Sequence, residues 1–131
     1  MTTIHIKCDH CGNRIEDLHA FHAGFSNRGF LYCDRFAEIL EFDAFDPHFI
    51  AIVGDKHPWS LTPVEQSLVE EALEPSPRGG RFRFAASPRC PACNAPIEGL
   101  LADRFHFIEI GDVIDADSAR VWRSSVPRDS R

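Results

Sequence analysis

Long apolar runs are missing from this sequence of 131 residues. None comes near the roughly 20 consecutive apolar residues that a membrane-spanning helix needs. Residues 1–15 contain Cys, Asp, His and Arg and lack the apolar segment of a secretory signal. Internal repeats and low-complexity segments are also lacking, apart from two short cysteine pairs. We therefore expect a cytoplasmic protein with no membrane segment.

Lysine is scarce, since only Lys7 and Lys56 are present, and the formal net charge is −6. Diffuse binding to nucleic acid depends on many phosphate contacts, so this acidic balance opposes it. The twelve arginines are unevenly spread, however, and several fall between residues 78 and 89 or after residue 120. A local basic patch is therefore expected in spite of the overall charge.

Recognisable catalytic signatures are lacking as well. The sequence has no Ser-His-Asp spacing of a serine hydrolase and no phosphate-binding loop. The segment from Cys90 to Cys93 is similar to the last part of the zinc deaminase signature, but the His-x-Glu element of that signature is missing. We therefore expect a protein that is not an enzyme.

The sequence does contain enough apolar material for one core. Hydrophobic residues make up 44% of the chain, with eleven Phe among them, which suits one domain of ordinary size. Ser, Arg, Pro and Asp dominate residues 124–131, a composition typical of a disordered terminus. We predict a single domain over residues 1–123, followed by a disordered tail.

Hydrophobic periodicity predicts a small α+β domain of mostly antiparallel strands with one main helix. Strands are expected at residues 4–7, 29–33, 37–42, 49–53, 81–84, 105–110 and 113–114, with a turn at 43–48.

The clearest helix covers residues 63–73, because Thr62 and Glu65 form a capping box and a proline occupies the first helical position. Its buried face is expected to hold Val64 and Leu68, together with Val69 or Leu73.

Five cysteines in a chain without an export signal argue for metal or thiol chemistry before disulfides. Four of them form two C-x-x-C units, Cys8 with Cys11 and Cys90 with Cys93. Two thiolates three positions apart on a tight turn reach one ion at about 2.3 Å, and two such turns complete a tetrahedron. The sequence therefore predicts one structural Zn²⁺ ion bound by these four cysteines.

The two units and their flanking strands resemble the zinc-ribbon, or rubredoxin-like, superfamily. Gly12 and Asn94 follow the units and suit the left-handed backbone of such turns. Ribbons usually hold their two turns much closer together, so residues 12–89 are expected to be a β-rich insertion. Lengthening the loop from roughly 15 to roughly 80 residues raises the free energy of loop closure by only about 1.5 kcal/mol. A structural zinc site contributes on the order of 10 kcal/mol of stability. The resemblance implies a structural four-thiolate site in a protein that binds other macromolecules.

Other interpretations of these residues stay open. A disulfide is less favoured because of the expected cytoplasmic location, and a redox pair as in thioredoxin is less favoured because that motif stands alone at a helix start. His19 and His22 follow Cys11 too closely for a two-Cys, two-His finger. We expect both histidines to be surface or hydrogen-bonded groups, and His10 to face solvent.

Two further segments look like altered metal-binding turns. Three residues after Cys33, where the second cysteine of a C-x-x-C unit would stand, the sequence has Phe36. Residues 76–80 end in Gly-Gly but have Ser76 and Arg78 at the thiolate positions. Our hypothesis is that an ancestor bound two zinc ions and that this chain kept one, leaving Cys33 as an ordinary buried thiol.

An acidic cluster spans the end of the third predicted strand and the turn after it, and its members are Glu41, Asp43, Asp46 and His48. Such a cluster could hold a second metal or take part in acid–base chemistry. We favour the simpler interpretation of an acidic turn after a strand.

A closed four-thiolate site argues against catalysis, since a catalytic zinc keeps a position open for water. The leading interpretation is a non-enzymatic protein-interaction or scaffold module whose partner is another protein. The alternative is a zinc ribbon that binds nucleic acid through an arginine-rich strand, with contacts from Arg78, Arg81, Arg83 and Arg89. Nothing in the sequence indicates the oligomeric state.

Overall fold

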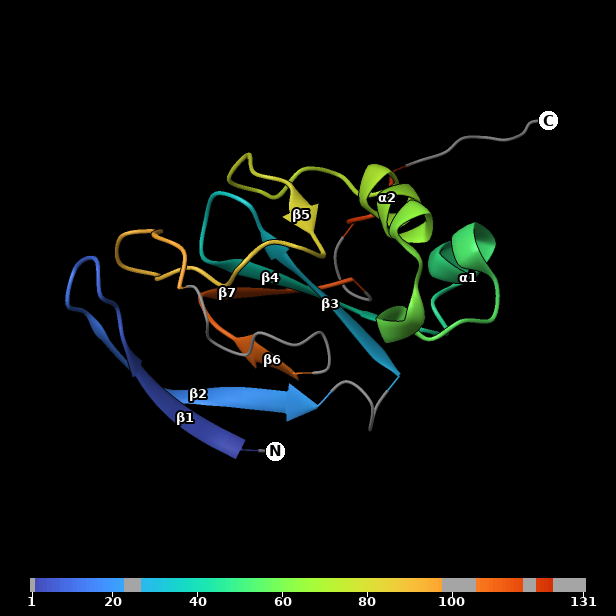
Figure 1. The fold of residues 1–131 in the computed structure, drawn as a ribbon. Coiled ribbons are helices and arrows are strands. Elements are labelled where there is room, and N and C mark those ends of the chain that lie inside the picture. The colour runs from blue at the N-terminus through green and yellow to red at the C-terminus, as the bar shows by residue number, and fades with distance from the viewer. Residues whose placement is uncertain (1, 23–26, 98–105, 117–119, 124–131) are drawn as a thin grey trace.

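The computed structural model describes residues 2–22, 27–97, 106–116 and 120–123. They form a three-stranded sheet, a four-stranded sheet and a group of helices on the far side of the second sheet (Figure 1). The strands are β1 (Thr2–Lys7), β2 (Arg14–His22), β3 (Arg28–Cys33), β4 (Glu38–Asp43), β5 (Phe82–Arg83), β6 (His106–Glu109) and β7 (Asp112–Asp115). The helices are α1 (Pro47–Val53), a 3₁₀ turn η2 (Pro58–Ser60) and α2 (Pro63–Glu71). This arrangement agrees with the expected α+β class.

One of the two sheets is mixed. The first sheet is antiparallel with the order β1-β2-β6, and the second has the order β5-β3-β4-β7. β3 and β4 are antiparallel neighbours, as predicted, with Leu31 opposite Leu40. β4 and β7 are parallel, with Leu40 opposite Ile114. A parallel pair needs a long crossover, and here it contains both helices, β5, the second cysteine unit and β6.

The four-stranded sheet is buried on both faces. Phe30 and Tyr32 of β3 pack against the three-stranded sheet. Leu31, between them, packs on the other face in a cluster that includes Phe49 of α1 and Val69 of α2. Because successive side chains of a strand point to opposite faces, a strand buried on both sides needs apolar residues in succession.

The helix α1 occupies the segment 49–53, for which a buried strand was predicted, so that prediction is wrong. Asp46 caps this helix, with its Oδ1 accepting a hydrogen bond from the His48 amide at 2.8 Å, and a proline follows at the first helical position. A run of five apolar residues has no periodicity that separates strand from helix. In α1 only Phe49 is buried, and the residues after it are at least partly exposed.

The helix α2 confirms the predicted helix, although it ends at Glu71, two residues earlier than expected. Its capping box is present. Thr62 Oγ1 accepts a hydrogen bond from the Glu65 amide at 3.2 Å, and Glu65 Oε1 accepts one from the Thr62 amide at 2.9 Å.

The predicted buried face of α2 is wrong in part. Val64 is 69% exposed and Leu68 47% exposed, whereas Val69 is fully buried. Glu70, next to Val69, accepts a hydrogen bond from the Phe84 amide through its Oε2 at 2.9 Å. Val69 and Glu70 therefore lie on the side of α2 that faces the sheet and the segment after β5, and Val64 and Leu68 are exposed.

The other strand predictions are largely confirmed by β1, β5, β6 and β7. In β5, Phe82 is buried and Arg83 exposed, as strand alternation predicted. The strand β2 was not predicted. Residues 124–131, expected to be a disordered tail, lie outside the described residues, and the single domain over 1–123 stays a prediction. Within the described part of the chain, no helix is long and apolar enough to cross a membrane.

Candidate metal centre

The four cysteines of the two C-x-x-C units meet at one point. Their Sγ atoms all lie within 4.8 Å of one another. Between the units, Cys8 Sγ lies 3.7 Å from Cys93 Sγ, and Cys11 Sγ lies 3.7 Å from Cys90 Sγ. These separations are far longer than a disulfide bond of about 2 Å. Cys8 and Cys90 are buried while Cys11 is exposed, so the cluster lies at the surface with one side toward solvent.

Each unit is a tight turn closed by the same two backbone hydrogen bonds. In the first turn the Gly12 amide donates to the Cys8 carbonyl at 2.8 Å, and the Cys8 amide donates to the Asn13 carbonyl at 2.8 Å. The second turn has the two corresponding bonds, at 2.7 and 3.0 Å. The residue after the second cysteine is left-handed in both turns, with φ of 79° at Gly12 and 62° at Asn94. This confirms the backbone predicted for those two positions.

The two turns reach the cluster from different sheets. The first turn joins β1 to β2, and the second belongs to the loop after β5 (Figure 1). Asn94 anchors the second turn: its Oδ1 accepts from the Ala37 amide at 3.1 Å, just before β4, and its carbonyl accepts from Arg89 Nη1 at 2.7 Å. An ion at the sulfur cluster would therefore fasten the β1–β2 hairpin to the four-stranded sheet.

The surroundings change the acidity of the thiols in opposite directions. The amide N–H groups of Cys11 and His10 lower the pKa of the Cys8 thiol to about 7, in spite of its burial. The Ala95 amide lowers the pKa of Cys93, but burial and hydrogen bonds with the other three thiols outweigh it and raise that pKa to about 12. Four sulfur atoms this close cannot all ionise unaided, and a bound divalent cation would balance their charge.

The cluster fits a tetrahedrally coordinated ion. Metal–sulfur bonds of about 2.3 Å imply sulfur–sulfur edges of about 3.8 Å in a tetrahedron, close to the 3.7 Å of both pairs across the site. Within the part of the chain that the structure describes, this is the one group of at least three Cys, His, Asp or Glu side chains close enough to share an ion. The four cysteines together could therefore bind a metal.

A family model matches residues 4–98, which are most of the chain and include both cysteine turns. The chain belongs to the DUF8255 family. That family is described as a domain of unknown function, so membership assigns no activity to this DUF8255 domain. No curated protein and no solved structure matches the chain. The resemblance to zinc ribbons therefore rests on the cysteine turns alone.

Two histidines near the first turn of this DUF8255 domain, His10 and His19, are not among the clustered groups. His10 is exposed, as expected. His19 is half-exposed, and its Nδ1 lies 3.7 Å from Glu109 Oε1, in keeping with a surface group. The side chain of His22 lies outside the described residues.

The acidic cluster is spread along a strand end, a turn and a helix cap. Glu41 Oε1 lies 3.5 Å from Arg28 Nη2, whereas Asp43 Oδ1 accepts a hydrogen bond from the Phe45 amide at 2.8 Å. Asp46 is the N-cap of α1. The favoured interpretation of an acidic turn therefore accounts for Asp43. Glu41 lies within β4, and α1 begins at Pro47.

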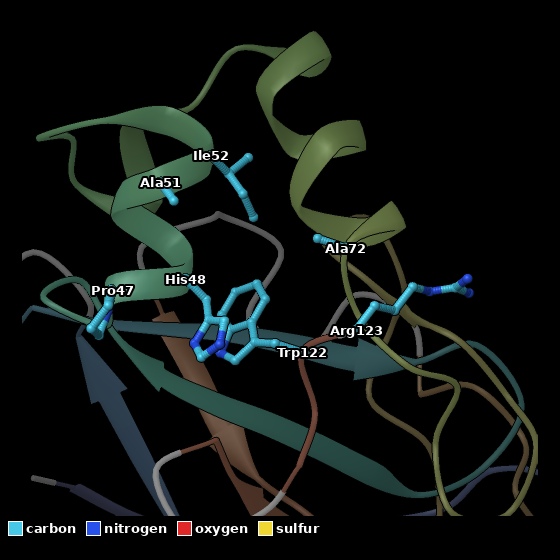
Figure 2. Close-up of a pocket in the computed structure, with 7 residues that line it drawn as sticks. All are labelled: Pro47, His48, Ala51, Ile52, Ala72, Trp122 and Arg123. Atoms are coloured by element: carbon cyan, nitrogen blue, oxygen red, sulfur yellow. The ribbon is translucent and has the colours of Figure 1, made fainter. Parts of the chain in front are cut away.

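A pocket of about 340 Å³ beside this helix cap has no signal in the sequence. Asp46 Oδ2 accepts a hydrogen bond from Trp122 Nε1 at 2.9 Å, and the His48 ring stacks on Trp122 with centroids 5.6 Å apart. Figure 2 shows the two rings face to face near the ends of α1 and α2, with the Arg123 side chain pointing away from them. The lining comes from α1, Ala72, Trp122 and Arg123. Since 76 positions separate Asp46 from Trp122, no local pattern could have joined them.

Two of the four arginines suggested for partner contact face acidic or aromatic groups of the domain. Arg83 lies 3.7 Å from Asp34 and 3.4 Å from Glu70, measured between nitrogen and carboxylate oxygen. The guanidinium carbon of Arg78 lies 4.4 Å above the ring centre of Phe36, a cation–π geometry.

The other two arginines are Arg81, directly before β5, and Arg89, directly before the second cysteine turn. Arg81 is half-buried, and its amide donates to Asp34 Oδ1 at 2.9 Å. Arg89 donates from Nη1 to the Asn94 carbonyl. The structure therefore gives three of the four side chains, on Arg78, Arg83 and Arg89, a partner within the domain.

Proposed function

We propose that this domain binds one structural Zn²⁺ ion through Cys8, Cys11, Cys90 and Cys93. The observation that carries the proposal is the meeting of four sulfur atoms from two tight turns within 4.8 Å. Zinc suits a tetrahedral set of four thiolates, whereas magnesium and calcium prefer oxygen ligands. The two hydrogen-bonded turns present the sulfurs with the backbone already arranged.

The ion would stabilise the fold and take no part in catalysis. Four thiolates fill a tetrahedron and leave no position for water or substrate, so the proposal includes no enzymatic activity. Its physical effect would be to join the hairpin of β1 and β2 to the second cysteine turn, across 78 intervening residues of the sequence. Binding free energy of this kind becomes folding free energy, because the unfolded chain has no preformed site.

For the cellular role we propose a cytoplasmic protein-interaction or scaffold module whose partner is another protein. Apolar side chains exposed on or near the two helices support this role; they are Phe45, Ile50, Val64 and Leu68, with exposures of 66, 42, 69 and 47%. The helices α1 and α2 lie side by side (Figure 1). Exposed apolar side chains gathered on neighbouring elements are typical of protein-interaction sites.

Nucleic-acid binding is the alternative, and the geometry supports it less. Arg83 faces two carboxylates, and Arg89 donates to a backbone carbonyl. Phosphate groups would have to displace these contacts before either side chain could bind them. Association with DNA or RNA that weakens steeply with salt would favour the alternative, and capture of a protein partner unaffected by nuclease would favour the interaction module.

Metal content of the purified full-length chain tests the zinc site. Elemental mass spectrometry on wild type, Cys33→Ala and Cys93→Ser should give one zinc per chain in the first two and less than one in the third. The matched change at Cys33 removes a thiol that lies outside the cluster. Wild type without zinc after expression in zinc-supplemented medium, or zinc lost with Cys33, would contradict the proposed ligands.

A further inference from the structure

The pocket of about 340 Å³ beside the cap of α1 has a mostly apolar lining. Ile52 of α1 and Ala72 at the end of α2 point toward one another across it (Figure 2). The stacked rings of His48 and Trp122 form its aromatic side. An apolar cavity of about 150 Å³ is enough to take a benzene ring, so a phenyl group fits this pocket.

The aromatic side of the pocket is held in place by contacts within the domain. Trp122 Nε1 donates to Asp46 Oδ2 at 2.9 Å, and the ring of Phe42 meets the indole edge-on with centroids 5.9 Å apart. The Asp46 side chain is only 6% exposed. Both of its oxygens accept hydrogen bonds from the domain, so its charge is compensated. The pocket is therefore built in the free chain and presents an aromatic surface.

A large aromatic side chain stands in solvent next to this pocket. Phe45 is 66% exposed, and it precedes by two residues Pro47, which lines the pocket. Phe45 is not among the lining residues, so it does not fill the pocket of its own chain. Aromatic side chains that enter pockets are common anchors of protein interfaces. One copy of the chain therefore carries both an aromatic anchor and a pocket that an anchor of this size fits.

The charges around the two features are complementary. Beside the pocket, Arg123 is exposed, and its Nε donates to the Leu73 carbonyl at 3.2 Å. Within the described part of the chain, no carboxylate forms an ion pair with Arg123. Beside the anchor, Asp43 Oδ1 accepts a hydrogen bond from the Phe45 amide at 2.8 Å. An anchor that enters the pocket of a second copy therefore brings a carboxylate toward a basic rim.

We propose that the domain forms a symmetric dimer in which Phe45 of each copy fills the pocket of the other. A two-fold axis makes the same contact twice, because each copy supplies one anchor and one pocket. The phenyl ring packs against Trp122, as aromatic pairs do at interfaces. This inference rests on the interaction role proposed above and names a second copy of the chain as the partner.

The test is the molar mass of the full-length chain in solution, measured by sedimentation equilibrium. At about 0.15 M salt the Debye length is about 8 Å, which screens the repulsion between two copies of net charge −6. Wild type should show a monomer–dimer equilibrium. Phe45→Ala should raise the dissociation constant about tenfold or more. Ala51→Trp should have a similar effect, because it fills the pocket from an exposed lining position.

Val64→Ala is the matched control. Val64 is 69% exposed, like Phe45, but it does not line the pocket. Its replacement should leave the dissociation constant within about twofold of wild type. Wild type that stays monomeric up to about 1 mM would overturn the proposal, and so would a dimer that all three changes weaken equally.

The fluorescence of Trp122 reports on the pocket itself. The chain has two tryptophans, so Trp59→Phe leaves Trp122 as the one emitter. Its emission should change on dilution in step with dissociation, and this change should be absent when Phe45→Ala is added. A dimer that dissociates without changing this emission would contradict the proposed contact. A monomeric chain that binds a different protein would overturn the dimer and leave the interaction role standing.

Discussion

The hydroxyl of Tyr32 on β3 bonds both backbone groups of Ile108 on β6. It donates to the Ile108 carbonyl oxygen at 3.1 Å and accepts from the Ile108 amide at 2.9 Å. β6 is an edge strand of the three-stranded sheet, so the tyrosine takes the place that a neighbouring strand would have. Burial raises the pKa of Tyr32, which keeps the hydroxyl protonated for this bond. One side chain thus links the two sheets directly.

Replacing Tyr32 by Phe should lower the free energy of unfolding by about 1–3 kcal/mol, because the Ile108 amide and carbonyl are left buried without partners. Urea denaturation of the metal-loaded protein measures the change. Ser60→Ala is the control, since it removes a surface hydroxyl bonded to the His57 carbonyl. Its cost should stay within about 0.5 kcal/mol. Equal losses in the two variants would contradict the linking role of Tyr32.

Removing the metal should loosen the β1–β2 hairpin before the rest of the domain. The hairpin carries two of the four sulfurs, whereas the core around Phe49 and Val69 lies on the far face of the four-stranded sheet. We expect a chelator to lower the melting temperature strongly and to speed amide exchange in β1 and β2 more than in β3 and β4. Cys8→Ser should show fast hairpin exchange without chelator. If amide exchange speeds up equally in all four strands, the metal does not act locally on the hairpin.

The two carboxylate oxygens of Asp46 accept different hydrogen bonds, so the loss of stability should depend on which of them a substitution removes. Its Oδ1 caps α1 and its Oδ2 accepts from Trp122 Nε1. Asp46→Ala removes both bonds, together with the 3.1 Å contact between Oδ1 and His48 Nδ1, and should cost about 2–3 kcal/mol, whereas Asp46→Asn keeps a good N-cap and should cost about 1 kcal/mol. Urea unfolding followed by tryptophan fluorescence gives both values. A loss below about 0.5 kcal/mol in Asp46→Ala would show that neither bond matters.

Features decided by a few adjacent residues could be predicted from the sequence. The capping box of Thr62 and Glu65 and the left-handed residues after the cysteine pairs depend on local chemistry, and both are present. Exposure of Val64 could not be predicted, because the buried side of α2 is set by contacts with distant parts of the chain, such as the packing of Val69 in the core and the bond between Glu70 and the Phe84 amide.

Strand β2 shows a different reason for failure. Its inward residues include Ile15, Leu18 and Ala20, a spacing that breaks the strict alternation expected of a strand. Asp17 has a φ of 59°, and the pairing with β1 shifts register between Ile4 and Ile6. This irregularity hides the strand from a search for period two, although β1 and β2 are paired on both sides of it.

Glu41 makes the stability of the domain depend on pH. Its side chain is 12% exposed. Burial, assisted by the neighbouring Glu109 carboxyl, raises the pKa of Glu41 to about 8, although Arg28 opposes the rise. In the unfolded chain the same group should titrate near pH 4.3. The folded state therefore binds more protons between these values, and the free energy of unfolding falls as the pH rises from about 4.3 to about 8.

Replacing Glu41 by Gln should remove this dependence, because the amide keeps the shape of the protonated acid and cannot ionise. Each pKa unit corresponds to about 1.4 kcal/mol. The advantage of Glu41→Gln over wild type should therefore grow by about 1–2 kcal/mol between pH 6.5 and 8.5, measured by urea unfolding of metal-loaded protein. Glu16→Gln, at an exposed position, is the control and should run parallel to wild type. If the free energy of unfolding of Glu41→Gln also runs parallel to that of wild type across this pH range, Glu41 is ionised in the folded protein.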